Sequence, residues 1–388
     1  MTEAGRDNHP QPHNKNGRRR CRPRPLVMAT LLLLVITGSI YAAFELSPRP
    51  SATLIRLAFE KQANQLNTAL APLRPAYVRV REDIPYAPDD PDAQLDLYSP
   101  QLNGRPMPLV VWVPGGAWVA GSKEGIANYS ALLAGHGYAV AALNYSLAPA
   151  AHYPKPVEQV SRALAFLDRN AGKLNLDTSR VFLAGDSAGA QIAAQVGNLI
   201  ASSDYAGELG IEPPLQRRQL SGLLLYGGAY DLEQLNFDGP HGEFLRSVLW
   251  AYSGDRDFLD NPEFDTASVR QYLTADFPPT FISSGNGDPL LAQSQSMAAT
   301  LKELGVPVTP LFFPADYSPA LPHEYQFNLG IAAGRLALQQ SLRFLSRQLR
   351  ATWAAPAGPF APAPRPLRHP RQLTRGSAQL TGSPLLSD

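Results

Sequence analysis

The chain has 388 residues, of which 44% are hydrophobic, and its formal net charge is +1. That length accommodates one large α/β domain with appendages, and the near-neutral charge gives no indication of a nucleic-acid partner. Cys21 is the only cysteine, which excludes an intrachain disulfide, a cysteine-based zinc cluster and a thiol redox pair.

A basic leader precedes a long apolar run at the N-terminus. Residues 1–25 carry five closely spaced arginines, and the 19 residues from 26 to 44 include no charge. A helix of about 20 apolar residues can span a bilayer. A signal peptide usually has a shorter core of roughly 7–15 residues and a small-x-small cleavage site. Residues 39–44 offer no good pair of this kind where cleavage is needed, so we expect an uncleaved transmembrane anchor over residues 26–44.

The arginines also predict the orientation of this anchor. Positive charge gathers on the cytoplasmic side of a membrane span, and the arginine cluster lies on the N-terminal side only. We therefore expect residues 1–25 to be a cytoplasmic leader and the following domain to be periplasmic or otherwise extracytoplasmic. If the apolar run is instead a signal sequence that is cleaved, the domain is secreted.

Strand and helix patterns alternate through the central part of the chain. A linker and a first amphipathic helix are expected over residues 45–74, with helical spacing from 51 to 73. Residues 75–350 then predict one α/β domain, with a mostly parallel central sheet and helices on both faces, one of them near residues 157–174. Ligands of such folds bind beyond the carboxyl ends of the strands. Strands are expected at residues 77–81, 95–98, 108–113, 138–143, 180–184, 220–226, 279–283 and 306–313.

The most informative motif is Gly-Asp-Ser-Ala-Gly at residues 185–189, between the strand at 180–184 and a helical pattern at 191–196. In that context G-x-S-x-G forms a sharp turn, which leaves the serine hydroxyl clear of the sheet and next to a helix N-terminus with free N–H groups. Five-residue matches also occur by chance, but the flanking elements favour the catalytic interpretation. Ser187 is the predicted nucleophile.

A serine nucleophile needs a histidine within hydrogen-bond reach, and in this fold that histidine comes last in the chain. Three histidines follow Ser187, namely His241, His323 and His369. His241 lies before the next sheet strand, and His369 lies in the C-terminal tail. His323 follows the last expected strand, so we predict that it is the general base. The structural alternative is an exposed loop histidine that caps the final helix.

A carboxylate should follow the strand at residues 279–283 and orient this histidine. Asp288 stands there, 35 residues before His323. Its structural alternative is a helix N-cap, because a proline follows it. Asp231 is the other candidate for the acid, but it lies too early in the chain. We predict the triad Ser187, Asp288 and His323.

The tetrahedral intermediate of acyl transfer also needs N–H donors for its oxyanion. One donor is expected from Ala188, the residue after the nucleophile. The others are expected from the glycine-rich loop after the strand at 108–113, where Gly116 and Ala117 would donate and Gly115 would shape the loop. Neither a helix nor a lysine follows this loop, so it does not read as a phosphate-binding cradle.

An insertion at about residues 233–272 is expected to form a small helical cap between two sheet strands. Apolar residues recur in it at helical spacing, and Phe244 and Trp250 could line an acyl pocket. Trp118, in the oxyanion loop, could do the same. Packing of the cap helix on the domain is the alternative role for these side chains. At the other end, residues 351–388 are rich in proline, alanine and arginine and predict a disordered tail.

Together these residues resemble the α/β-hydrolase superfamily, in its esterase/lipase branch of hormone-sensitive-lipase-like and bacterial acetyl- and feruloyl-type carboxylesterases. The resemblance covers roughly residues 75–350 and departs from the family at Pro114, where the family usually has histidine. It implies a structural role for Asp186, at the elbow or its loop. The motifs that carry the resemblance are 115–118, 144–149, 153–154, 185–189, 287–289 and 323–324.

We therefore predict a membrane-anchored serine hydrolase that cleaves carboxylic esters with short to medium acyl chains through an acyl-enzyme, without cofactor or metal. Its substrate would be a small molecule or a lipid- or polysaccharide-linked ester. A formamide or amide hydrolase with the same triad is the nearest alternative. A non-catalytic binding protein on a hydrolase scaffold is the alternative of a different class. The sequence does not indicate the oligomeric state.

Overall fold

The computed structural model describes residues 25–101 and 104–354. Cys21 and the predicted leader up to residue 24 lie outside the described residues, as does the predicted tail from residue 355. Residues 351–354 belong to the final helix α11 (Ala332–Ala354).

The described residues form one eight-stranded sheet, in the order β1-β2-β4-β3-β5-β6-β7-β8. The first two strands pair antiparallel, and β2 also pairs antiparallel with β4, whereas all other pairs are parallel. The predicted mostly parallel sheet is confirmed. The strands are β1 (Val78–Pro85), β2 (Gln94–Pro100), β3 (Met107–Val113), β4 (Ala139–Leu143), β5 (Leu176–Asp186), β6 (Leu220–Tyr226), β7 (Thr280–Ser284) and β8 (Val308–Phe312).

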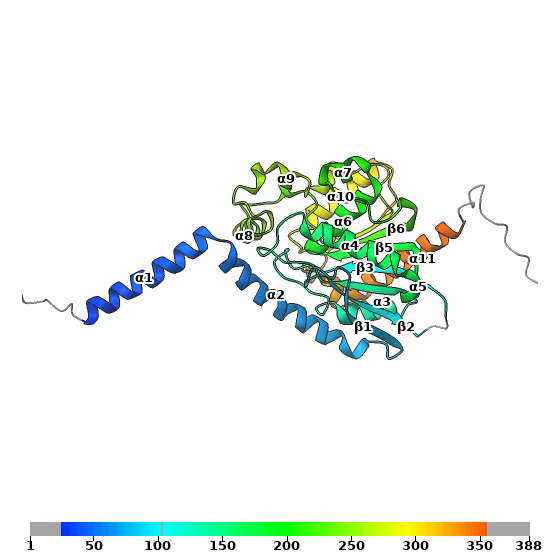
Figure 1. Cartoon of the computed structure of the whole chain (residues 1–388), viewed down its shortest axis with the longest axis horizontal. Coiled ribbons are helices and arrows are strands. Elements are labelled where there is room, and N and C mark those ends of the chain that lie inside the picture. The colour runs from blue at the N-terminus through cyan, green and yellow to red at the C-terminus, as the bar shows by residue number, and fades with distance from the viewer. Residues whose placement is uncertain (1–24, 102–103, 355–388) are drawn as a thin grey trace, which may run out of the picture.

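Helices cover both faces of this sheet (Figure 1). The α-helices are α1 (Pro25–Leu46), α2 (Arg49–Leu70), α3 (Ala127–Ala134), α4 (Lys155–Arg169), α5 (Ala171–Leu174), α6 (Ser187–Ala201), α7 (Ser203–Leu209), α8 (Gly242–Ser253), α9 (Pro262–Asp265), α10 (Leu291–Glu303) and α11. Short 3₁₀ turns lie at η1 (Ala71–Leu73), η2 (Arg217–Gln219), η3 (Leu232–Gln234), η4 (Phe258–Asp260), η5 (Val269–Tyr272) and η6 (Tyr325–Phe327).

The sheet separates two hydrophobic cores because successive side chains of a strand point to opposite faces. In β3, Leu109 and Val111 pack in the core under α4, α6 and α10, whereas Val110 and Trp112 pack in the core under α3 and α11. All four side chains are buried. This burial on both faces explains why β3 and β4 are continuous apolar runs in the sequence.

The structure places several element boundaries differently from the sequence pattern. Strand β5 begins at Leu176, ahead of the expected residue 180, because its first residues pair with the start of β3. The helix expected at 157–174 is two helices, since α4 ends at Arg169 and α5 ends at Leu174, where the next residue, Asn175, is in the left-handed conformation. Strand β8 contains Pro310, which an edge strand tolerates because one row of its backbone groups has no partner strand.

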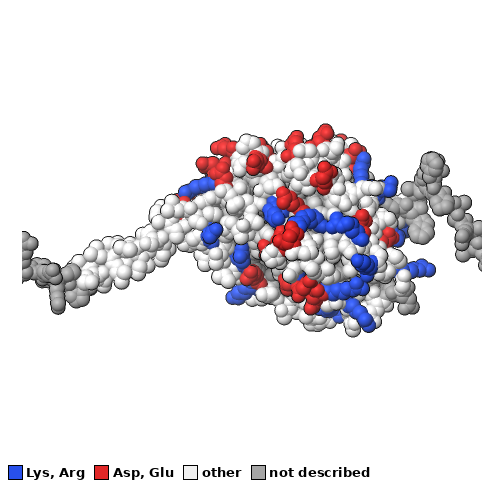
Figure 2. Space-filling view, viewed as in Figure 1, with Lys and Arg blue, Asp and Glu red and all other residues white. Residues whose placement is uncertain are grey.

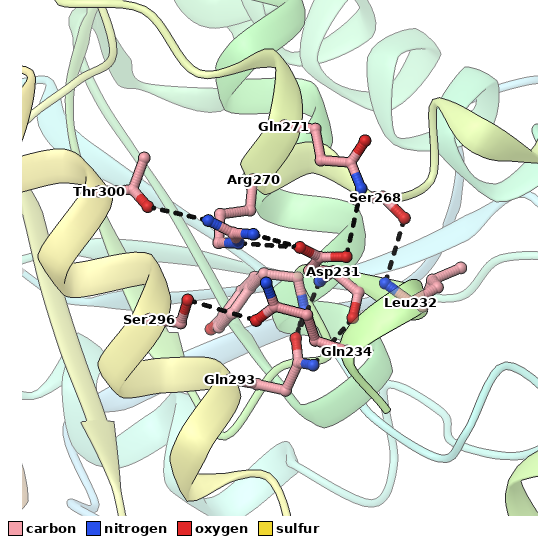
Figure 3. A network of polar contacts seen from close by, with 10 residues as sticks. Asp231, Leu232, Gln234, Ser268, Arg270, Gln271, Gln293, Ser296 and Thr300 are labelled. Carbon is pink, nitrogen blue, oxygen red and sulfur yellow. Dashed lines mark hydrogen bonds and ion pairs between the residues drawn. The ribbon is translucent and has the colours of Figure 1, made fainter. Parts of the chain in front are cut away.

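Residues 232–272, which we call the cap segment, connect β6 to β7 and contain α8, α9 and three 3₁₀ turns. A buried ion pair joins its two ends (Figure 3). Arg270 donates from Nε at 2.9 Å and from Nη2 at 2.5 Å to Oδ2 of Asp231, whose side chain is 1% exposed. Gln293 of α10 accepts the N–H of Asp231 and donates to its carbonyl oxygen. The cap segment is thus fastened to the domain at its base.

Helix α1 projects away from the domain, and α2 runs back along it (Figure 1). Among the described residues, α1 is the one helix that is long and apolar enough to cross a membrane, and its side chains are exposed. Figure 2 shows it as an uncharged rod up to the end that joins the domain. By length and composition it fits a membrane anchor or a signal sequence alike.

We expect Arg270→Ala to destabilise the folded domain by about 3 kcal/mol, because it leaves the buried Asp231 carboxylate without its cation. Urea unfolding followed by circular dichroism measures this loss. Arg217→Ala is the matched control, since Arg217 pairs with Asp276 where both side chains are more than half exposed, and its loss should cost no more than about 1 kcal/mol. Equal destabilisation by the two changes would contradict the role given to the buried pair.

Candidate active site

The backbone of Ser187 is strained in the way that a nucleophile elbow requires. Ser187 follows β5 directly and begins α6, with φ of +50°. A non-glycine residue adopts this left-handed region only under constraint from its surroundings. The turn also brings α6 against the sheet, since a Cβ atom on Gly189 would lie 2.1 Å from the carbonyl oxygen of Val113. Glycine is therefore required two residues after the serine.

Asp186 ties the elbow to the neighbouring strand and to the glycine-rich loop. Its Oδ1 accepts a hydrogen bond from Nε1 of Trp112 at 2.7 Å, and its Oδ2 accepts one from the backbone N–H of Gly115 at 2.9 Å. Its side chain is buried. These contacts fit the structural role that the family resemblance implied for Asp186. They also occupy the N–H of Gly115, which leaves that residue to shape the loop.

Asp288 and His323 lie together although 35 residues separate them in the chain. Oδ1 of Asp288 is 2.9 Å from Nδ1 of His323. Asp288 follows β7 and also accepts hydrogen bonds from the Ser284 hydroxyl and the Leu290 N–H, so both of its oxygens are fixed. Among the described residues, no hydrogen bond joins the Ser187 hydroxyl to His323. Such contacts are often long before substrate binds.

Hydrogen bonds between two loops hold Asp288 and His323 in position relative to each other. The loop after β7 presents Asn286, whose Oδ1 accepts from the N–H of Leu321 and whose Nδ2 donates to the carbonyl oxygen of Tyr317. The N–H of Gly287 donates to the carbonyl oxygen of Leu321. The loop that carries His323 is thereby fastened to the loop that carries Asp288.

The ionisation of the pair follows from this geometry. Burial alone would raise the pKa of Asp288, but the hydrogen bond and charge of His323 outweigh it and hold that pKa below its usual range. Burial alone would lower the pKa of His323, but the hydrogen bond and charge of Asp288, with smaller contributions from Glu324 and Asp186, raise it to about 9. The pair therefore favours an imidazolium paired with a carboxylate.

The glycine-rich loop after β3 supplies unpaired N–H groups. Within the described residues, the N–H groups of Gly116 and Ala117 form no hydrogen bond, and Ala188 lies in the first turn of α6, where N–H groups have no helical partner. Ala117 has φ of +52°, a second strained non-glycine residue near Ser187. The phenol of Tyr145 donates to the Pro114 carbonyl at 2.9 Å. That bond holds the loop where the family usually has a histidine.

Sequence reasoning missed Gly227, which follows β6 with φ of +54°. A Cβ atom there would lie 2.8 Å from Oδ2 of Asp288 and 3.1 Å from Cε1 of His323. Gly227 follows β6, which lies next to β7 in the sheet. The order of strands in the sheet identifies this residue, and the local sequence pattern does not reveal that order. Glycine leaves the space that the side chains of Asp288 and His323 occupy.

The three candidate pocket residues all contact the cap segment or belong to it. Trp118 is buried, donates from Nε1 to Oε1 of Gln191 and stacks on Tyr252 of α8 with ring centroids 4.8 Å apart. Phe244 contacts Phe59 of α2, with ring centroids 5.9 Å apart. These contacts pack the cap onto the domain.

Trp250 lies near the C-terminal end of α8, where the guanidinium of Arg256 is 5.2 Å from its ring centroid. A role of Trp118, Phe244 or Trp250 in binding an acyl chain stays a prediction.

Other polar candidates lie outside this arrangement. Asp231 is occupied by Arg270 in the ion pair of Figure 3. His241 is exposed at the start of α8, and His369 lies outside the described residues. Over residues 25–101 and 104–354, no group of three or more His, Cys, Asp or Glu side chains is arranged to hold a metal ion.

Comparison with known proteins matches the BD-FAE family over residues 95–302, more than half of the chain. The esterase LipQ of Mycobacterium tuberculosis is 31% identical over 59% of this chain, and the chain spans about half of that protein, 54%. The acetyl esterase of Salmonella schwarzengrund is 28% identical over 67% of this chain and 77% of its own.

Solved structures agree on the fold. The crystal structure of esterase B from Lactobacillus rhamnosis covers 79% of this chain and 98% of its own, with a TM-score of 0.66 and 23% identity. A second structure of that esterase, with a tributyrin phosphonate, covers 78% of this chain and 96% of its own, with a TM-score of 0.65 and 23% identity. The predicted α/β-hydrolase fold is confirmed.

We expect Gly227→Ala to lower kcat for a soluble nitrophenyl ester by about 100-fold, because the new methyl group displaces Asp288 and His323. It should also cost about 1 kcal/mol of stability through its positive φ. Gly210→Ala is the matched control, since Gly210 has φ of +64° and open space around its Cα. Steady-state kinetics and thermal melting of both variants separate the two effects. Unchanged kcat in Gly227→Ala would contradict the close packing at this position.

Proposed function

The chain belongs to the BD-FAE family of α/β-hydrolase esterases, and we propose that it is a carboxylic ester hydrolase that acts through the triad Ser187, His323 and Asp288. The observation that carries this proposal is the 2.9 Å contact between Asp288 and His323, and the left-handed backbone of Ser187 at the nucleophile elbow supports it. The three residues follow the ends of β5, β7 and β8, at the carboxyl edge of the sheet, where ligands of α/β folds bind.

The first half of the reaction forms an acyl-enzyme. Nε2 of His323 takes the proton of the Ser187 hydroxyl while Oγ forms a bond to the carbonyl carbon of the ester. Asp288 holds Nδ1–H and stabilises the imidazolium that results. The imidazolium then gives its proton to the departing alkoxide as the C–O bond breaks, which releases the alcohol.

The second half repeats these steps with water. His323 takes a proton from a water molecule as the water oxygen attacks the acyl carbon. It then returns a proton to Oγ of Ser187 as the free acid leaves. In both halves the oxyanion accepts hydrogen bonds from the N–H groups of Gly116, Ala117 and Ala188. Gly115 shapes the loop, because its N–H is held by Asp186.

Substrates are esters with short to medium acyl chains. Two relatives support this size: the matched Salmonella protein is an acetyl esterase, and esterase B was solved with a tributyrin phosphonate. The buried contacts of Trp118 with Tyr252 also bring the cap close to the oxyanion loop and limit the space beside it. The alcohol part is a small molecule or a lipid- or polysaccharide-linked group.

The domain is held at a membrane by an uncleaved α1, with residues 1–25 in the cytoplasm and the catalytic domain outside it. The length and exposed apolar surface of α1 support this location. Its last turn also contacts the cap segment, since Arg256 donates at 2.9 Å to both the carbonyl oxygen and Oε2 of Glu45. These hydrogen bonds fasten the end of the anchor to the cap segment.

Ser187→Ala should lower the hydrolysis of p-nitrophenyl butyrate at least about 10⁴-fold, because alanine lacks the hydroxyl that forms the acyl-enzyme. The release of nitrophenol measures this loss. Ser203→Ala is the control, since Ser203 is an exposed serine at the start of α7. Full activity in Ser187→Ala would refute the assignment of the nucleophile.

The location has a separate test in spheroplasts of a bacterial host that produces the full chain. Protease added outside should digest the catalytic domain and spare the basic leader, which a tag at residue 1 reports. Lysed spheroplasts are the control, in which both parts are digested. Protection of the catalytic domain in intact spheroplasts would reverse the proposed orientation, and absence of the leader from the membrane fraction would indicate a cleaved signal sequence.

A further inference from the structure

Glu324 lies beside the reactive nitrogen of His323. Its Oε1 is 3.8 Å from Nε2, the nitrogen that faces away from Asp288. Adjacent side chains usually point apart, but Glu324 has φ of +57°, a left-handed conformation that is strained for a non-glycine residue. This turn brings two consecutive side chains to the same site. Strain of this kind persists only where the surrounding structure holds it.

The same carboxyl group reaches the glycine-rich loop. A Cβ atom on Gly115 would lie 3.0 Å from Oε1 of Glu324 and 2.4 Å from Oδ2 of Asp186, so the two carboxyl groups meet at this glycine. Burial and the charge of Glu324 raise the pKa of Asp186 well above its usual range, and a hydrogen bond with Glu324 adds to that effect. Two carboxyl groups can share such a bond only when one of them carries the proton.

No cation of the described residues other than His323 pairs with this group of carboxyl groups. The ion pairs of Asp288 and of Glu324 are both with His323, and Asp186 has none. Asp288 faces Nδ1 from the loop after β7, and Asp186 lies below the glycine-rich loop at the end of β5. The other titratable groups that face the cluster are phenols whose pKa burial raises: Tyr129, Tyr145, Tyr226, Tyr230 and Tyr325.

We propose that Glu324 is a positioning residue, which holds the imidazole of His323 from its Nε2 side and is itself held by a hydrogen bond to Asp186 under the oxyanion loop. This inference rests on the proposed function, because it assigns His323 the role of general base. The chain from Trp112 through Asp186 and Glu324 to His323 then links the core of the sheet to the base.

The charge of Glu324 should stabilise the protonated imidazole of His323 both before substrate reacts and in the transition state. As the proton of Ser187 moves to Nε2, the imidazole gains positive charge, which a carboxylate at this distance stabilises. The same charge favours the protonated histidine before substrate reacts, so the base becomes available only at higher pH. With the pKa of His323 at about 9, kcat/KM of the wild-type enzyme should rise with pH up to about that value.

Glu324→Gln tests this role, because it keeps the size and the hydrogen-bonding groups and removes the charge. The acid limb of the kcat/KM profile for p-nitrophenyl butyrate should move to lower pH by about one unit. At the plateau, kcat should fall by about tenfold with KM changed by less than about twofold. Glu324→Asp keeps the charge and should keep the acid limb near its wild-type position.

Two controls make the outcome decisive. Glu303→Gln removes the same charge at the exposed end of α10 and should leave the profile unchanged. Thermal melting reports whether Glu324→Gln is folded. An acid limb that stays at the wild-type pH in folded Glu324→Gln, or one that moves equally in Glu303→Gln, would overturn the inference. If either result occurs while Ser187→Ala is inactive in the same assay, only the role of Glu324 is refuted, and the proposed function stands.

Discussion

The hydrogen bonds of the Asp186 carboxyl group are the constraint on which the rest of the site depends. They join the last residue of β5 to Trp112 of β3 and to the backbone of Gly115. The strained serine and the loop with unpaired N–H groups are therefore fixed relative to each other. Trp112 lies in the core under α3 and α11, with its ring 5.3 Å from that of Tyr129. Packing on the far face of the sheet thus sets the geometry of the catalytic edge.

The remaining parts of the site are held by contacts between segments far apart in the chain. Asn286 joins the loops that carry Asp288 and His323, and Tyr145 holds the carbonyl oxygen of Pro114. The ion pair of Asp231 and Arg270 closes the base of the cap segment over the same edge. Each contact satisfies a polar group that would otherwise be costly to leave unpaired in a partly buried site. The same contacts that satisfy these polar groups therefore also fix the positions of the loops around the site.

Local pattern located the strands approximately, together with the sharp turn at residues 185–189, and it singled out Asp288 and His323, which the structure brings to 2.9 Å of each other, because chain order and periodicity carry that information. It was not sufficient for Gly227 or Glu324, whose importance comes from neighbours that the fold brings in from other strands and loops. The start of β5 at Leu176 was missed for the same reason, since pairing with β3 extends it. For Trp118, composition allowed a pocket or a packing role, and only the stack on Tyr252 shows how it packs.

In the proposed reaction Ser187 carries the acyl group. Treatment of the full chain with a fluorophosphonate, followed by peptide mass spectrometry, tests it most directly, because the reagent forms a stable bond with an activated serine. We expect one adduct, on the peptide that contains Ser187, and its loss in His323→Ala, since the hydroxyl then lacks its base. An adduct on another residue, or an unmodified Ser187 in a preparation that hydrolyses esters, would contradict the account.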